Sequence, residues 1–151
     1  MSTYTVTGND TLTLNGRVII DNAYGTVSQV AFPNELVTNK TGKNGNTVLA
    51  QNASGFNAML TMRLTRGSSD DQFMQALVPA SGSGFPSTTL LAGTFVKNLG
   101  DGQGNVVSDT YALQGGIISK QVEGAENVEG DTEQGVAVYN VKFSNAARVI
   151  S

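Results

Sequence analysis

Hydrophobic and polar residues alternate most regularly in the middle of the chain, between residues 57 and 65. The apolar members are Ala58, Leu60, Met62 and Leu64, and the polar members are Asn57, Thr61, Arg63 and Thr65. A period of two is typical of a half-buried β-strand. We therefore expect a strand here, with one face against the core and the other free to meet a polar surface.

A short helix is predicted directly after this strand, ending before Pro79. Ser68 or Ser69 is a candidate N-cap, and Asp70 and Asp71 follow at the positive end of the helix dipole. The apolar residues then recur at i, i+3 and i+4, at Phe73, Ala76 and Leu77. This spacing favours packing of one helix face over the apolar face of the strand.

Other alternating runs bring the total to about eight strands, joined by turns rich in Gly, Asn and Pro. The remaining runs are 3–7 (a strand or an ordered arm), 11–20 with an interruption at Gly16, 26–32, 37–43, 47–52, 89–98, 106–119 and 135–144. We expect residues 89–98 to be covered on both faces, because both are apolar. Gly115-Gly116 predicts a bend or bulge, and residues 80–86 predict a flexible loop. The pattern indicates one mainly β domain over 1–151, sandwich-like or barrel-like, with one flanking helix and a hairpin extension.

The extension is predicted at 36–53, where Asn44-Gly45 separates two strand-like runs. Asn-Gly is the strongest short hairpin signal, because both residues tolerate positive φ. The arms are polar, however, and an isolated two-stranded hairpin is marginally stable in water. We expect contact with another subunit to order it.

Composition removes several function classes. The chain of 151 residues contains no cysteine, histidine or tryptophan. Thiolate nucleophiles, Ser-His-Asp triads, disulfide scaffolds and zinc sites with Cys or His ligands are thereby excluded. The first residues show no signal peptide pattern, and no long apolar run predicts a membrane span. We therefore expect a chain that is made in the cytoplasm and soluble there.

The net charge of −3 is unevenly distributed. Five of the 12 acidic residues fall in one base-free window, which we call the acidic patch: Glu123, Glu126, Glu129, Asp131 and Glu133. It is either a solvated loop or a surface that docks a basic partner or repels DNA. The Lys and Arg residues are scattered, unlike those of a nucleic-acid binder.

The remaining chemical motifs have simpler structural explanations. Gly100, Gly102 and Gly104 predict a turn, because the spacing does not match a dinucleotide fingerprint. Asp101, Asn105 and Asp109 are oxygen ligands suited to Ca²⁺, but the EF-hand spacing is absent, which favours a solvated loop.

The charged pairs near the predicted helix are also explained without a catalytic or phosphate-binding site. Adjacent Asp70 and Asp71 diverge on a helix and are explained by capping rather than by catalysis. Arg63 and Arg66 are explained by strand-surface or interface ion pairs more readily than by phosphate binding.

Four runs, taken in order and spacing, carry a family resemblance: 11–17, 32–37, 40–46 and 63–73, with a weaker echo at 143–148. Over about residues 10–78 the chain resembles the tail tube proteins of contractile-tailed bacteriophages. The resemblance implies a β-sandwich-like subunit with one helix that forms hexameric rings, stacked into the hollow inner tube of the virion tail. Baseplate hub, tail-terminator and non-contractile tube proteins are related alternatives.

This resemblance implies a structural protein without cofactor, metal or enzymatic activity. Its partners would be copies of itself, the tail sheath, the baseplate and the tail terminator, while the tape measure protein and DNA pass through the bore without specific binding. We predict subunit contacts at the hairpin and on the polar strand face: Lys40, Lys43, Asn44, Asn57, Thr61, Arg63 and Thr65.

A glycan-binding or receptor-binding β-sandwich module of a phage fibre or baseplate is the alternative function. Sugar sites usually stack rings on aromatic side chains, and the chain offers no Trp and four Tyr residues: Tyr4, Tyr24, Tyr111 and Tyr139. A hydrolase with two carboxylates is a third class, but no pair is placed by the sequence.

Overall fold

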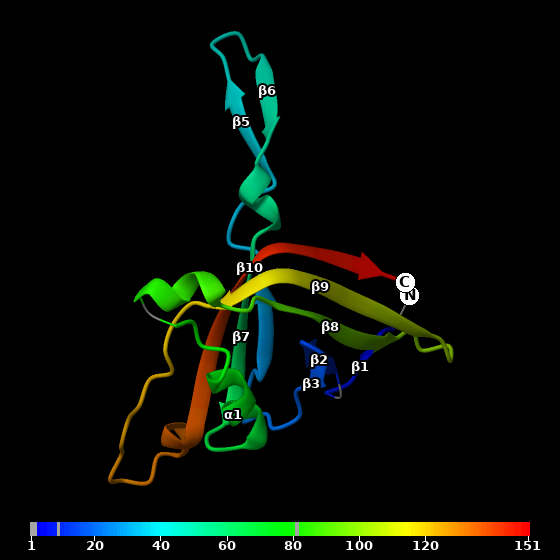
Figure 1. Ribbon diagram of the computed structural model, residues 1–151. Coiled ribbons are helices and arrows are strands. Elements are labelled where there is room, and N and C mark those ends of the chain that lie inside the picture. The colour runs from blue at the N-terminus through cyan, green and yellow to red at the C-terminus, as the bar shows by residue number, and fades with distance from the viewer. Residues whose placement is uncertain (1–2, 9, 81) are drawn as a thin grey trace.

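The computed structural model describes residues 3–8, 10–80 and 82–151 and shows a mainly β protein (Figure 1). The strands are β1 (Thr5–Val6), β2 (Thr11–Leu14), β3 (Arg17–Val18), β4 (Ser28–Ala31), β5 (Val37–Thr41), β6 (Thr47–Gln51), β7 (Ala58–Thr65), β8 (Leu91–Gly100), β9 (Val106–Ile118) and β10 (Val136–Ile150). The helical elements are α1 (Ser69–Gln75) and the 3₁₀ turns η1 (Ala53–Phe56), η2 (Gly82–Ser87) and η3 (Thr132–Gly135).

Eight of these strands form one antiparallel sheet in the order β3-β2-β8-β9-β10-β7-β4, with β1 paired to β8. Strands β5 and β6 form a separate two-stranded sheet. The predicted mainly β, sandwich-like or barrel-like class is confirmed. Within the described residues, no helix is long and apolar enough to cross a membrane.

Strand β10 connects two halves of the large sheet. Its first part, Val136 to Phe143, pairs with β7, while its later part, Val141 to Ile150, pairs with β9. Figure 1 shows the two parts running in different directions, so the sheet folds over on itself along β10. A strand shared in this way lets two half-sheets enclose one core.

The fold line lies at Gly115, where the backbone takes φ +65°. Here β9 contains one residue more than β8 across the same stretch, because Leu91 pairs with Gly116 but Gly93 pairs with Leu113. A Cβ atom at Gly115 would lie 2.1 Å from the Ser144 hydroxyl oxygen of β10. Glycine supplies both the positive φ and the close approach, so the bend predicted at Gly115-Gly116 is confirmed.

The core lies between the two half-sheets and is built from the alternating residues of β7 and β10. Its buried members are Leu12, Leu14, Ile19, Ala58, Leu60, Met62, Leu64, Met74, Leu91, Leu113, Ile118, Ala137, Tyr139, Val141, Phe143 and Ala146. The predicted apolar face of β7 is therefore confirmed. Full burial of one such aliphatic side chain contributes about 1.5–3 kcal/mol.

Helix α1 closes one end of this core, but with a different residue from those predicted. Met74 is fully buried, Phe73 and Leu77 are partly buried, and Ala76 is exposed. The buried residues of α1 are Asp70 and Met74, which lie one turn apart on the same face of the helix. Because one of them is a carboxylate, the apolar spacing alone did not identify this face. Ser68 is the N-cap, with its hydroxyl accepting from the Asp71 amide at 3.2 Å.

Two predicted strands have different limits in the structure. Residues 11–20 do not form one interrupted strand, because Asn15 and Gly16 make a two-residue turn between β2 and β3, with φ of 49° and 81°. This is the Asn-Gly turn that the right-handed twist of hairpins favours. The last strand does not end at Ser144 but continues through Ile150 alongside β9.

Two further predictions between α1 and β9 are wrong. Residues 80–86 are not simply a flexible loop, because η2 occupies Gly82–Ser87, while Ser81 lies outside the described residues. Strand β8 is not covered on both faces within the single chain: Leu91 is buried, but Ala92 and Thr94 on the other face are exposed. Apolar composition alone does not distinguish burial inside a subunit from exposure on its surface.

Candidate assembly surfaces

The β5–β6 hairpin stands away from the body of the protein (Figure 1). All ten residues of its two strands are exposed, and neither strand pairs with the large sheet. At its base, the Asn52 amide donates to the Leu36 carbonyl at 2.9 Å, and η1 leads directly into β7. The predicted hairpin extension is confirmed, and its base is joined to the body by this hydrogen bond and by η1.

Both faces of this hairpin carry exposed hydrophobic side chains. Leu49, which pairs with Asn39, is 70% exposed on one face, and Val48, which pairs with Lys40, is 69% exposed on the other. Paired residues in an antiparallel ladder share a face, whereas successive residues alternate. A hairpin that rested on one surface would need one apolar face only, so this pattern suits insertion between two surfaces.

The tip of the hairpin holds Lys43 and Asn44, and Lys40 lies close by on β5. The Gly45 amide donates to the Gly42 carbonyl at 3.0 Å, and Gly45 takes φ +84°. Asn44 is absent from the residues with positive φ, so the loop is not the Asn-Gly turn that we predicted. It is a longer loop with glycine alone in the left-handed region.

The polar face of β7 is used largely within the chain. Strand β7 lies between β10 and β4, so it has no open edge along most of its length. The Arg63 guanidinium pairs with Glu133 at 2.6 Å and lies over the Tyr24 ring at 5.4 Å from its centroid. The hydrogen bond from Arg63, and then that from Tyr24, lower the pKa of the Glu133 carboxyl.

The other polar residues of this face have mixed surroundings. The Thr61 hydroxyl donates to Asn140 at 3.2 Å, Thr65 is exposed and reaches the Asn22 carbonyl only at 3.5 Å, and Asn57 is partly buried below η1. Contact of Asn57, Thr61, Arg63 and Thr65 with another subunit remains a prediction.

The acidic patch lies on the long connection between β9 and β10, and its side chains project from that connection. Folding brings bases to it that the sequence window lacked, because Lys120 pairs with Glu123 at 3.2 Å and Arg63 pairs with Glu133. Asp131 caps η3 by accepting from the Glu133 amide at 3.0 Å. Glu126 and Glu129 are exposed, so the net negative charge of the patch is smaller than the sequence indicated.

Arg66 holds the base of this connection in place. Its guanidinium donates to the carbonyl oxygens of Glu123, Gln134 and Val136 at 2.8–3.0 Å. These contacts supply Arg66 with acceptors inside the chain, which agrees with a surface role better than with phosphate binding. The two ends of the connection are thereby held together at the end of β7.

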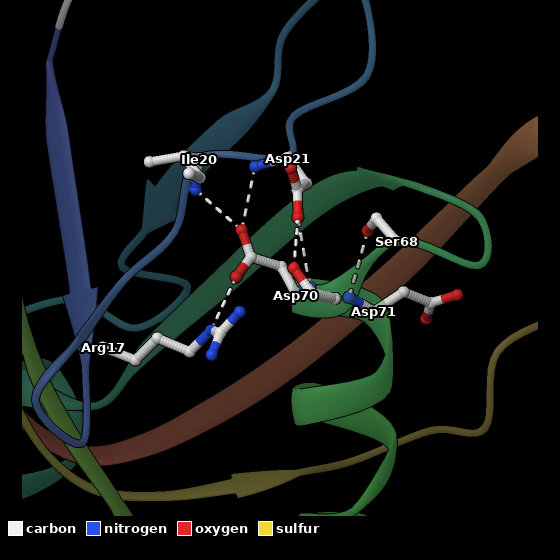
Figure 2. Close-up of polar contacts among 7 residues, drawn as sticks. Arg17, Ile20, Asp21, Ser68, Asp70 and Asp71 are labelled. Carbon is white, nitrogen blue, oxygen red and sulfur yellow. Dashed lines mark hydrogen bonds and ion pairs between the residues drawn. The ribbon is translucent and has the colours of Figure 1, made fainter.

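A buried carboxylate joins α1 to the β2–β3 hairpin (Figure 2). Asp70 is fully buried, accepts from Arg17 at 2.7 Å, and accepts from the amides of Ile20 and Asp21 at 2.7 and 2.8 Å. Burial raises the pKa of the Asp70 carboxyl, but the two amides and Arg17 outweigh it, so the pKa lies below its ordinary value. The sequence explained Asp70 only by the helix dipole and gave no signal for this partner.

The neighbouring carboxylate, Asp71, points elsewhere. It accepts from the Tyr139 hydroxyl and from the Gly67 amide. Burial, and then the contact with Asp71, raise the pKa of the Tyr139 hydroxyl. Both carboxylates therefore have structural partners on opposite sides of the helix, and neither pairs with the other.

The three oxygen ligands considered for Ca²⁺ are also separated. Asp101 accepts from Asn105 within the β8–β9 turn, whereas Asp109 forms a two-pronged ion pair with Arg148 at 2.8 and 3.0 Å. Among the residues that the structure describes, no group of three or more Asp or Glu side chains is placed to hold a metal.

One broad face of the sheet carries no charge. Pairing assigns to it the outward residues of β2, β3, β8, β9 and β10: Thr11, Thr13, Val18, Ala92, Thr94, Val96, Asn98, Ser108, Thr110, Ala112, Gln114, Asn145, Ala147 and Val149. We call this the uncharged face. The charged residues of β8, of β9 and of β10 beyond Phe143 lie on the opposite face, where Lys97 pairs with Asp10 and Arg148 with Asp109. Lys142 is on the outward side of β10 before the bend and is not part of the uncharged face.

Such a distribution is unusual, because exposed sheet faces normally carry charged side chains that favour solubility. Thr11, Ala92, Thr94, Ala147 and Val149 of the uncharged face are exposed. The face therefore offers no Lys or Arg to a polyanion and no carboxylate to a basic partner.

The sheet also has unpaired edges in the described part of the chain. Strands β3 and β4 are its two ends. Strand β7 begins at Ala58, opposite Phe143, so the β7 side of β10 has no partner beyond that residue. Unpaired edges are templates for pairing with another chain.

No protein-family model matches this chain, and no curated protein matches its sequence.

Proposed function

We propose that this chain is a structural subunit of a bacteriophage tail, which assembles into hexameric rings that stack into the hollow inner tube through which the genome is delivered. The projecting β5–β6 hairpin carries the proposal. It exposes apolar residues on both faces and has no partner within the described chain. Such a hairpin gains stable surroundings when another copy covers it.

The unpaired edges support the same proposal. A head-to-tail contact between one surface of a subunit and a different surface of the next builds rings or open filaments. Strand edges at β3, β4 and the end of β10 are separate surfaces on one subunit. They provide distinct contacts around a ring and between rings.

The uncharged face suits the bore of such a tube. Protein affinity for DNA comes mainly from Lys and Arg contacts with phosphates. A wall without Lys or Arg side chains lets a polyanion such as DNA pass without being held. The tape measure protein and DNA would occupy this bore during assembly and delivery, while the sheath, baseplate and terminator would contact other surfaces. This role needs no catalysis or cofactor.

Removal of residues 39–46, with a two-residue Asn-Gly turn in their place, tests the role of the hairpin. The hairpin shares no strand pairing with the large sheet, so the body should keep its circular dichroism spectrum and thermal midpoint. We expect this variant to remain a single subunit by analytical ultracentrifugation under conditions that assemble the wild type. Tubes of normal length from the shortened variant would overturn the assignment of the hairpin.

A further inference from the structure

The chain contains two Asn-Gly dipeptides, Asn15-Gly16 and Asn44-Gly45, in very different surroundings. The first is a tight turn within the large sheet, and the second is at the tip of the projecting hairpin. Asn-Gly is chemically the least protected sequence for an asparagine, because glycine has no side chain to hinder attack by its amide nitrogen. The two sites therefore test how the fold controls the same reaction.

We propose that Asn44 is a site of spontaneous deamidation and that folding protects Asn15 from it. In this reaction the Gly45 backbone nitrogen attacks the Asn44 Cγ atom. The new N–Cγ bond forms as the Cγ–Nδ2 bond breaks, and ammonia leaves with the proton from the Gly45 amide. Water then opens the resulting succinimide at either carbonyl, which yields aspartate or isoaspartate. The net change is amide plus water to carboxylic acid plus ammonia, without an oxidant or reductant.

Asn15 is held against this reaction at two points. Its side-chain Oδ1 accepts from the Ala92 amide at 2.9 Å, and its own amide donates to the Ala92 carbonyl at 2.8 Å. The Asn15 Cγ cannot turn toward the Gly16 nitrogen without breaking the first of these bonds. The turn is further fixed by pairing of Leu14 with Gly93 in the core sheet. Reaction at Asn15 thus requires opening of a well-packed part of the protein.

Asn44 has no comparable restraint. It is exposed, and no hydrogen bond involves its side chain among the contacts of the described residues. The Gly45 amide is bonded only to the Gly42 carbonyl across the loop. Because the hairpin is an exposed two-stranded sheet, local opening of this loop costs little. The reactive conformation is consequently accessible without unfolding of the body.

The product alters the charge at the tip. Lys40 and Lys43 are the charged residues between 36 and 53, so the tip begins with two positive charges. A carboxylate at position 44 cancels one of them beside Lys43. Isoaspartate also adds a backbone carbon, which changes the shape of the loop. This inference does not depend on the proposed assembly, because it concerns the free subunit.

The test follows both sites in one sample. The single-subunit fraction from size exclusion is incubated at mildly alkaline pH, and a Val48→Ser, Leu49→Ser variant serves if the wild type is fully assembled. Peptide mapping by mass spectrometry and an isoaspartate-specific methyltransferase then quantify conversion at each asparagine. A parallel incubation in denaturant gives the intrinsic reactivity of both dipeptides, and Asn44→Gln provides a variant with a longer, far less reactive side chain.

We expect Asn44 to convert at least about tenfold faster than Asn15 in the folded subunit, because only the local opening is needed at the hairpin. In denaturant the two rates should become similar. The isoaspartate signal should disappear from the Asn44→Gln variant. Equal conversion of the two sites in the folded chain, or intact Asn44 where Asn15 has reacted, would overturn the proposal.

Discussion

The Nε atom of Arg17 lies 2.7 Å from Oδ1 of Asp70, although 53 residues separate them in sequence. The same guanidinium lies over the Phe73 ring, 5.1 Å from its centroid. Arg17 begins β3, and Asp70 is in the first turn of α1. This ion pair therefore fixes the helix directly against the β2–β3 hairpin.

Asp70→Asn should destabilise the protein by about 3 kcal/mol, because a fully buried group loses its charge-assisted hydrogen bonds and leaves Arg17 without its partner. Chemical denaturation at pH 7 measures this loss. Asp71→Asn is the matched control at the neighbouring position, where part of the side chain is exposed. A larger loss for Asp71→Asn than for Asp70→Asn would contradict the assigned role.

The contribution of Asp70 should also depend on pH. Its pKa is lowered in the folded chain, so the contribution is present above the unfolded value of about 4 and is lost as the pH falls through the folded value. The difference in unfolding free energy between wild type and Asp70→Asn should therefore shrink below about pH 4. Thermal melts of both proteins between pH 7 and pH 3 check this. A difference that stayed constant over that range would exclude linkage through Asp70.

Substitution by alanine should lower the unfolding free energy much more at Asn15 than at Asn44. Asn15→Ala removes the hydrogen bond to Ala92 and places a Cβ-bearing residue without a polar side chain at φ 49°, which should cost about 1–3 kcal/mol. Asn44→Ala lies on an exposed loop, so the expected change is within about 0.5 kcal/mol. Urea unfolding of the two variants compares them directly. Equal losses would show that the hairpin tip is as tightly bound to the fold as the β2–β3 turn.

Polar substitution of the hairpin should separate assembly from folding. Val48→Ser with Leu49→Ser removes exposed apolar groups, so the unfolding free energy of the subunit should change by less than about 0.5 kcal/mol per site. Assembly should be lost, because these side chains provide the proposed contacts. Leu60→Ala, in the core, is the reverse control, with an expected loss of about 2–5 kcal/mol. Sedimentation and thermal melts report the two effects separately.

Basic residues on the uncharged face should create DNA affinity in an assembled tube. Thr94→Lys with Ala147→Lys places positive charges on β8 and β10, on either side of Ala112 of β9, without altering the core. Wild-type tubes should release labelled DNA, whereas tubes of the variant should retain it in a manner that weakens with added salt. Glutamine at both positions is the matched control. Retention of DNA by wild-type tubes would contradict the placement of this face at the bore.

Elements set by local pattern were predictable from the sequence. The alternation in β7, the Ser68 N-cap and the glycine bend at Gly115 each depend on neighbouring residues, and the structure contains all three. The hairpin at 36–53 was predictable for the same reason. The type of turn at its tip was not predictable, because the chain has two Asn-Gly pairs and only Asn15 takes a positive φ among the described residues.

Features set by distant residues were not predictable. The partner of Asp70 is 53 residues away, and nothing near Asp70 indicates it. The end of β10 was missed because the fold line shifts the alternation after Phe143, so that Ala146 becomes the buried residue. The sequence also could not show that Arg63, which is 70 residues from Glu133, would partly neutralise the acidic patch.

Self-assembly is the central claim, and negative-stain electron microscopy of the purified, concentrated wild-type chain tests it most directly. The exposed hairpin and unpaired strand edges predict rings and stacked hollow tubes of uniform diameter. Fields of dispersed single subunits at every concentration and salt condition would contradict the claim.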